Sequence, residues 1–209
     1  MKRSIILAVL LCAGGVAMAQ KTEKLFNGKD LSNWNFILAD SNVPAGQVYS
    51  ALDGVIHIKG NPLGYMYTKE KYGDCRLHVE WRWPEEATNS GIFLLIEEAK
   101  NPFPNGIECQ LAAGSAGDFV LLGGSDLAEF QAPRGVPRPS FPSVKKTNPS
   151  SEKPVGEWNE ANIFIKNGTI TAFINGVYQN TGTNKVKSGH IGLQSEGKDI
   201  EFRNLTITR

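Results

Sequence analysis

Residues 162–174 read NIFIKNGTITAFI, and this stretch decides the fold class. Runs rich in Ile, Phe and Thr lie on both sides of Asn167-Gly168, and these residue types favour strands. An Asn-Gly pair between two such runs is typical of a two-residue β-hairpin turn. The stretch therefore predicts two antiparallel strands, residues 161–166 and 169–174.

The same pattern extends outward from this hairpin in both directions. Asp53-Gly54 and Asn175-Gly176 predict further tight turns, and long helical periodicity is absent. Many short antiparallel strands over this length predict an all-β domain, either a β-sandwich or a jelly roll. The other predicted strands are residues 55–59, 75–83, 91–96, 107–111, 119–122, 190–194 and 200–208.

The first 19 residues have the features of a secretory signal peptide. A basic start precedes an apolar run, and residues 17–19, AMA, form a small-x-small cleavage site. The run is shorter than the roughly 18 to 20 residues that span a bilayer, so we expect no retained membrane anchor. A lipoprotein is the less favoured alternative, because Leu11 precedes Cys12 where a small residue is needed. We expect cleavage after Ala19, a periplasmic location and one domain over residues 20–209.

The predicted mature chain is close to neutral. The signal segment takes two of the 22 Lys and Arg residues and none of the 21 Asp and Glu residues. This balance argues against nucleic acid or an anionic membrane as a partner. Cys75 and Cys109 remain, and export permits a disulfide between them, but the sequence leaves their pairing open. Their number and spacing do not indicate a Cys-based metal site.

Polar side chains alternate with apolar ones in several predicted strands. If these strands share one curved sheet, their polar face lines a groove suited to sugar hydroxyls. The alternative is an ordinary solvated sheet face with routine cross-strand ion pairs. The side chains concerned are His78, Glu80 and Arg82 in RLHVEWRW (76–83), Glu108 and Gln110 in NGIECQL (105–111), and Gln194 and Glu196 in HIGLQSEG (190–197).

Other segments supply weaker candidates. Trp83 at a strand end and Trp158 beside a long loop are the tryptophans that we expect to contact a ligand. The loop, residues 125–157, is rich in Pro, Ser and Lys, and we expect it to cover the groove. Lys145 and Lys146 on this loop either reach the ligand or form a solvated basic pair. A divalent cation held by a scattered His together with Glu80 or Glu108 stays open.

Five sequence blocks resemble the 3-keto-disaccharide hydrolase family, and they cover nearly all of the predicted mature chain in order. The resemblance implies a concanavalin A-like β-sandwich of two antiparallel sheets, the architecture also used by laminarinase-type glycosidases and many lectins. The blocks are LFNGKDLSNW (25–34), LHVEWRWPEEATNSGIFL (77–94), IECQL (107–111), GEWNEANIFIKNGTITAFINGV (156–177) and GHIGLQSEGKDIEFRNLTI (189–207).

Two departures from these relatives bear on the chemistry. Laminarinase-type enzymes carry Glu-x-Asp-x-Glu on one strand, and here ECQLA keeps only Glu108, with Gln110 and Ala112 after it. A retaining mechanism from this strand therefore lacks its second carboxylate, which would lie about 5 Å away. The family's usual GLQ-x-HG block reads GLQSEG, with Glu196 in place of the His.

The resemblance implies a glycoside substrate already oxidised at C3 by a partner oxidoreductase. A C3 ketone acidifies the C2 proton, so one general base suffices for β-elimination of the glycosidic bond, followed by hydration. We predict Glu108 or Glu80 as the base, with Arg82, Gln110 or a divalent cation stabilising the enolate oxygen. The predicted hydroxyl-positioning residues are Asn89, Ser90, Gln194 and Glu196.

Two alternatives belong to other functional classes. A non-catalytic carbohydrate-binding module could use the same groove. An ordinary retaining glycosidase would need Glu80 and Glu108 on neighbouring strands.

Overall fold

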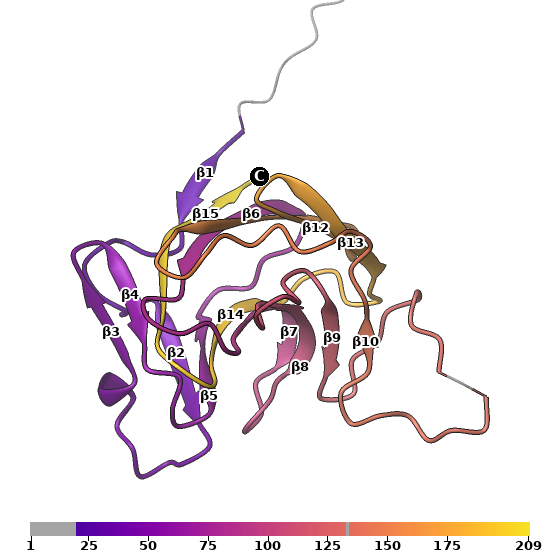
Figure 1. Ribbon diagram of the computed structural model, residues 1–209, viewed down its shortest axis with the longest axis horizontal. Helices are drawn as coiled ribbons and strands as arrows, with labels where there is room; N and C mark the ends of the chain where they lie inside the picture. The colour runs from indigo at the N-terminus through magenta and orange to yellow at the C-terminus, as the bar shows by residue number, and fades with distance from the viewer. Residues whose placement is uncertain (1–19, 133) are drawn as a thin grey trace, which may run out of the picture.

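Two antiparallel sheets packed face to face form the body of the protein (Figure 1). This computed structural model describes residues 20–132 and 134–209. The predicted signal peptide, residues 1–19, lies outside the described residues. The architecture is the predicted jelly-roll β-sandwich.

Sheet A forms the arched upper layer in Figure 1. Its β15 also pairs at one end with the short β1, so the first described strand and the last lie together. The strands run in the order β13 (Val177–Thr183), β12 (Thr169–Ile174), β11 (Asn159–Lys166), β6 (Cys75–Arg82), β15 (Ile200–Thr208), β4 (Val55–Ile58) and β3 (Tyr49–Leu52), with β1 (Thr22–Lys24) off this path.

Sheet B forms the second layer. A 3-10 turn, η1 (Ala45–Gln47), precedes β3 of sheet A. The strands of sheet B run in the order β10 (Ser143–Val144), β9 (Phe119–Leu122), β8 (Asn105–Gln110), β7 (Gly91–Glu98), β14 (His190–Ser195), β5 (Gly64–Thr68) and β2 (Trp34–Leu38).

The core lies between the sheets and is filled by alternate residues of each strand. Trp81 of β6 in sheet A and Cys109 of β8 in sheet B are both fully buried members of this core. Successive side chains of a strand point to opposite faces of its sheet. The residues that alternate with the core residues therefore face outward, on one side of the sandwich for sheet A and on the other side for sheet B. Glu80 and Glu108 therefore project from opposite faces of the molecule.

The hairpin turns have the geometry that the sequence predicts. Asn167 and Gly168 both have positive φ, 49° and 84°, which a type I′ turn requires. Asp53-Gly54 and Asn175-Gly176 repeat this pattern. All nine predicted strands are present, whereas β1, β2, β3, β5, β10 and β13 were not among the predicted ranges.

Two further observations concern the whole described chain. Cys75 and Cys109 are free thiols, buried in sheet A and sheet B respectively, so they form no disulfide bond with each other. Within residues 20–132 and 134–209, no helix is long and apolar enough to cross a membrane.

Candidate active site

A cavity of about 310 Å³ opens on the outer face of sheet B. This volume lies at the lower end of the range for small-molecule sites. Side chains from β8, β9, β14 and the segments next to β8, β9, β10 and β14 line it, together with Ser143 of β10 and with Asn89 just before β7. The cavity contains Glu108, Gln110, Asn89, Gln194 and Glu196, which are five of the residues predicted from the sequence.

Glu108 is the buried carboxyl group of this cavity. It is only 3% exposed, and its Oε1 atom has no hydrogen-bond partner among the residues that the structure describes. Burial, followed by the negative charge of Glu196, raises the pKa of Glu108 to about 8. A carboxyl group of this kind holds a proton at neutral pH and becomes a comparatively strong base once ionised.

A glycine of the neighbouring strand makes room for this carboxyl group. A β-carbon added to Gly91 would lie 2.2 Å from Glu108 Oε1 and 2.7 Å from its Cγ. The Glu108 side chain therefore rests against bare backbone of β7, and only glycine leaves that space. Gly91 follows Ser90 in NSGIF (89–93), and the close approach there fixes where the carboxyl group lies.

Amide groups beside Glu108 present hydrogen-bonding atoms to the cavity. Gln110 Oε1 accepts hydrogen bonds of 2.9 Å from the N–H groups of Leu111 and Ala112, which leaves its NH₂ group as the available donor. Gln194 Nε2 donates to Glu196 Oε2 at 2.7 Å. Buried Gln194 Oε1 and Asn89 Oδ1 lack partners within the described chain. Such buried acceptors suit hydroxyl donors of a bound ligand.

The part of the cavity wall next to Gln110 holds an ion pair that the sequence reasoning missed. Asp118, just before β9, is 4% exposed and accepts from Lys145 Nζ at 2.8 Å. The N–H group of Lys146 donates to the other Asp118 oxygen at 2.8 Å. Lys145 is the only basic side chain in the cavity wall as far as the described residues go. Of the two lysines, Lys145 is the one that lines the cavity together with the candidate base.

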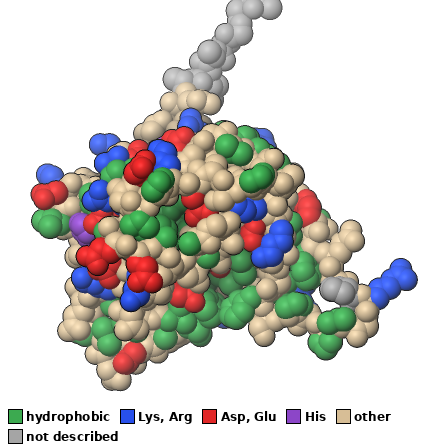
Figure 2. Space-filling model, in the orientation of Figure 1, with side chains coloured by type: hydrophobic (Ala, Val, Ile, Leu, Met, Phe, Trp, Pro, Cys, Tyr) green, Lys and Arg blue, Asp and Glu red, His purple; other side chains and the backbone are tan. Residues whose placement is uncertain are grey.

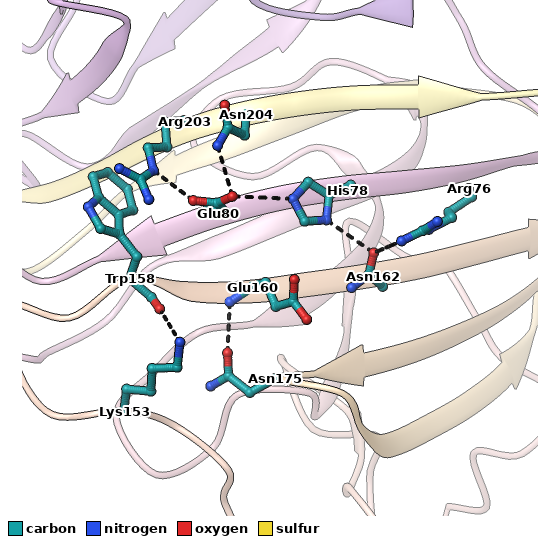
Figure 3. A network of polar contacts seen from close by, with 10 residues as sticks. All are labelled: Arg76, His78, Glu80, Lys153, Trp158, Glu160, Asn162, Asn175, Arg203 and Asn204. Carbon is teal, nitrogen blue, oxygen red and sulfur yellow. Dashed lines mark hydrogen bonds and ion pairs between the residues drawn. The ribbon is translucent and has the colours of Figure 1, made fainter. Parts of the chain in front are cut away.

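The expectation that Glu80 and Arg82 share a groove with Glu108 is wrong, because both lie on the outer face of sheet A, whereas Glu108 belongs to sheet B. Figure 3 shows Glu80 among its partners on that face. Glu80 accepts from Arg203 Nε at 2.6 Å and from Asn204 Nδ2 at 2.8 Å. Burial alone would raise the pKa of Glu80, but these hydrogen bonds outweigh it and leave the pKa below its ordinary value. Arg82 instead pairs with Glu201.

Three other predicted contacts also fall outside the cavity wall. Trp83 is 3% exposed and belongs to the core between the sheets, so the expected ligand contact is not available to it. Trp158 lies against Arg203, whose guanidinium carbon is 4.0 Å from the ring centroid, on the outer face of sheet A (Figure 3). Ser90 is fully buried and donates to the Gln194 carbonyl at 2.9 Å, which ties β7 to β14.

The long loop contributes to the site only through its second half. Phe141, Ser143 and Lys145 line the cavity, whereas residues 134–140 are all exposed and belong to the segment that projects from the body in Figure 1. The expected cover over the groove is thus reduced to one wall, built where β10 pairs with β9.

The cavity does not form a metal centre from its own side chains. Across residues 20–132 and 134–209, no group of three His, Cys, Asp or Glu side chains is arranged to hold a metal ion. Oxygen-rich cation sites draw on several such ligands.

Residues 21–208 match the model of the 3-keto-alpha-glucoside-1,2-lyase-like domain family. The chain belongs to this family. The chain is also similar to the 3-keto-disaccharide hydrolase of Bacteroides thetaiotaomicron. The two sequences are 23% identical over 229 residues, and the alignment covers 88% of this chain and 76% of that protein.

Solved structures show that the fold of this 3-keto-alpha-glucoside-1,2-lyase-like domain occurs in proteins of different classes. A candidate glycosyl hydrolase from Parabacteroides distasonis has 22% identity and a TM-score of 0.64, over 90% of this chain and 98% of that chain. The carbohydrate binding module CBM66 from Bacillus subtilis has 6% identity and a TM-score of 0.58, over 86% of this chain and 95% of that chain. The fold alone does not separate an enzyme from a binding module.

Proposed function

We propose that this protein cleaves 3-keto-glycosides, with Glu108 as the general base that removes the C2 proton. The observation that carries the proposal is the buried Glu108 carboxyl group, which has an oxygen without a hydrogen-bond partner among the described residues and which lines a cavity together with amides and one lysine. The name of the Bacteroides thetaiotaomicron relative supports the substrate class.

The proposed reaction needs one general base and one group that stabilises the negative charge on the C3 oxygen. Glu108 takes the C2 proton, and the resulting negative charge moves to the C3 oxygen as an enolate. The enolate then collapses, the C1–O bond breaks, and the leaving oxygen takes up a proton. Water adds to the C1=C2 bond to complete the hydrolysis. No oxidant is consumed because the ketone is present from the start.

We assign the stabilisation of the enolate oxygen to the Lys145 ammonium group, assisted by the NH₂ group of Gln110. Both line the cavity with Glu108, and both side chains carry hydrogen-bond donors. Asp118 holds the Lys145 ammonium group in place, so the positive charge is present before the enolate forms. A preorganised charge of this kind stabilises developing negative charge in a transition state. Arg82, the cationic side chain that the sequence predicts for this role, lies on the outer face of the other sheet.

The Glu80–Glu108 pair that a retaining glycosidase would need is absent, because the two residues project from different sheets. A binding module remains as the second class. We further propose export to the periplasm and a partner oxidoreductase that makes the C3 ketone.

The test uses a 3-keto-glucoside with a chromogenic leaving group, alongside the unoxidised glucoside. We expect turnover of the keto compound only, and its loss in Glu108→Gln. Glu160→Gln is the matched control, because Glu160 lies in sheet A outside the cavity. Binding of the keto compound without turnover by the unaltered protein would instead favour the binding module. Cleavage of the unoxidised glucoside would contradict the proposed elimination.

A further inference from the structure

The cavity changes from polar to apolar along the direction of its strands. Gln110 pairs with Gly91, two residues further back Glu108 pairs with Val120, and two residues beyond that Gly106 pairs with Leu122. Each two-residue step along a strand is about 7 Å. Glu108 therefore lies between a polar end, at the level of Gln110, and an end at the level of Leu122.

The end near Leu122 is built from hydrocarbon. Phe103 and Phe141 join Val120 and Leu122 in the cavity wall, and their rings meet edge to face with centroids 5.1 Å apart. Phe141 remains 53% exposed despite this contact, so much of its ring is free. Figure 2 shows hydrophobic side chains gathered near the base of the loop between β9 and β10. Ser143 pairs with Val120, so it stands at the level of Glu108 and not at the level of Leu122.

We propose that this apolar end is an aglycone subsite for an aromatic group, and hence that the preferred substrates are 3-keto aryl glycosides. The proposal rests on the proposed function and names its substrate class. The sugar would lie at the polar end, where the unpartnered oxygens of Asn89 and Gln194 accept its hydroxyls. The leaving group would then extend past Glu108 onto Phe141.

A second sugar ring fits the apolar end poorly. A pyranose carries several hydroxyls, and those that turn toward the apolar wall would lose their water without a protein partner, which costs free energy. An aromatic ring has no such requirement and gains from edge or offset contacts with Phe103 and Phe141. The unequal polarity of the two ends therefore matches an aryl glycoside better than a disaccharide.

The chemistry agrees with this assignment. In the elimination step, the C1–O electron pair leaves with the aglycone. A phenol, like the Tyr side chain, has a pKa of about 10, so a phenolate leaves without a general acid and takes its proton from water. The products are then the unsaturated 3-keto sugar, which adds water, and the free phenol.

The binding test uses unoxidised phenyl and methyl glucosides, because it does not depend on turnover. NMR titration of the full-length protein measures both dissociation constants. We expect the phenyl compound to bind at least about tenfold more tightly, and Phe141→Ala to remove this preference. Phe164→Ala is the matched control, since Phe164 is 42% exposed and stacks edge to face on Phe173 of sheet A. Phe103→Ala gives a second, independent alteration of the subsite.

The turnover test compares phenyl 3-keto-glucoside, methyl 3-keto-glucoside and a 3-keto-disaccharide. We expect Phe141→Ala to lower kcat/KM about tenfold or more for the phenyl compound and to leave the other two unchanged. An equal loss for the disaccharide would overturn the proposal, because the ring would then support a second sugar. If no keto compound is turned over while the phenyl preference in binding persists, the proposed function fails and the aromatic subsite stands. If the phenyl and methyl glucosides bind equally, the subsite fails.

Discussion

The Glu108 side chain lies directly over the backbone of Gly91, so closely that a methyl group at Gly91 would meet Glu108 Oε1 at 2.2 Å. Two adjacent strands, β7 and β8, meet at this point. The position of the candidate base is thus set by the absence of a side chain on its neighbour.

Gly91→Ala is expected to displace the Glu108 carboxyl group. Overpacking of this kind costs about 1–3 kcal/mol of stability, and a 1 Å displacement of a reacting group can lower kcat about a hundredfold. Gly46→Ala is the control, because a β-carbon there meets nothing within 4 Å. The measurements are urea unfolding and turnover of the keto substrate. A variant that is destabilised yet fully active would contradict the role of Gly91.

The fold could be predicted from the sequence far better than the site. Hairpin turns such as Asn167-Gly168 are local signals, and they located β11 and β12 correctly. β5, in contrast, is buried at four of its five residues, so it lacks the alternation that marks a strand with one exposed face. Its existence depends on contacts across the sandwich that no local pattern encodes.

The positions of the site residues also depend on contacts that no local sequence pattern encodes. Alternation identified the outward residues of each strand, but it does not say to which sheet a strand belongs. Glu80 and Glu108 occur in the same alternating pattern of polar and apolar residues. They nevertheless face opposite sides of the molecule, because β6 lies in sheet A and β8 in sheet B. Lys145 reaches the cavity through the two-residue pairing of β10 with β9, which has no sequence signature.

The pH dependence of turnover is expected to follow the ionisation of Glu108. Because burial and then Glu196 raise its pKa to about 8, kcat/KM should rise with pH and level off above that value. Glu196→Gln removes the negative charge, which is the smaller of the two causes of the raised Glu108 pKa. The midpoint of the pH profile should therefore move to lower pH but stay above the ordinary pKa of a glutamate. Glu160→Gln should leave the profile unchanged. A midpoint that does not respond to Glu196→Gln would contradict this assignment.

Lys145→Met is expected to lower kcat by about 10²- to 10³-fold, the usual loss when one donor to a developing oxyanion is removed. KM should change little, because the charge is needed mainly when the enolate forms. Lys145→Arg retains the positive charge and should recover part of the rate. Lys198→Met removes a surface lysine that pairs with Glu86, and it serves as the control. Equal losses in kcat for Lys145→Met and Lys145→Arg would show that charge is not what matters there.

Burial of Glu108 should also appear in the stability of the protein. Unfolded, this carboxyl group ionises near pH 4.5, whereas in the folded protein it ionises near pH 8. Between these values the unfolded chain has lost the proton that the folded protein retains, so rising pH favours unfolding. The slope is on the order of 1 kcal/mol per pH unit. Wild-type stability from this group is therefore fully present below pH 4.5 and is lost as pH rises through 8.

Glu108→Gln cannot ionise, so its stability relative to the wild type is expected to increase steadily over this range and to level off above it. Urea unfolding at pH values of about 5, 6.5 and 8 measures the difference. Glu160→Gln should show no comparable trend, because no buried carboxyl group is removed. A constant difference between Glu108→Gln and the wild type across these pH values would mean that Glu108 is already ionised in the folded protein. The candidate base would then lack the raised pKa on which its proposed strength depends.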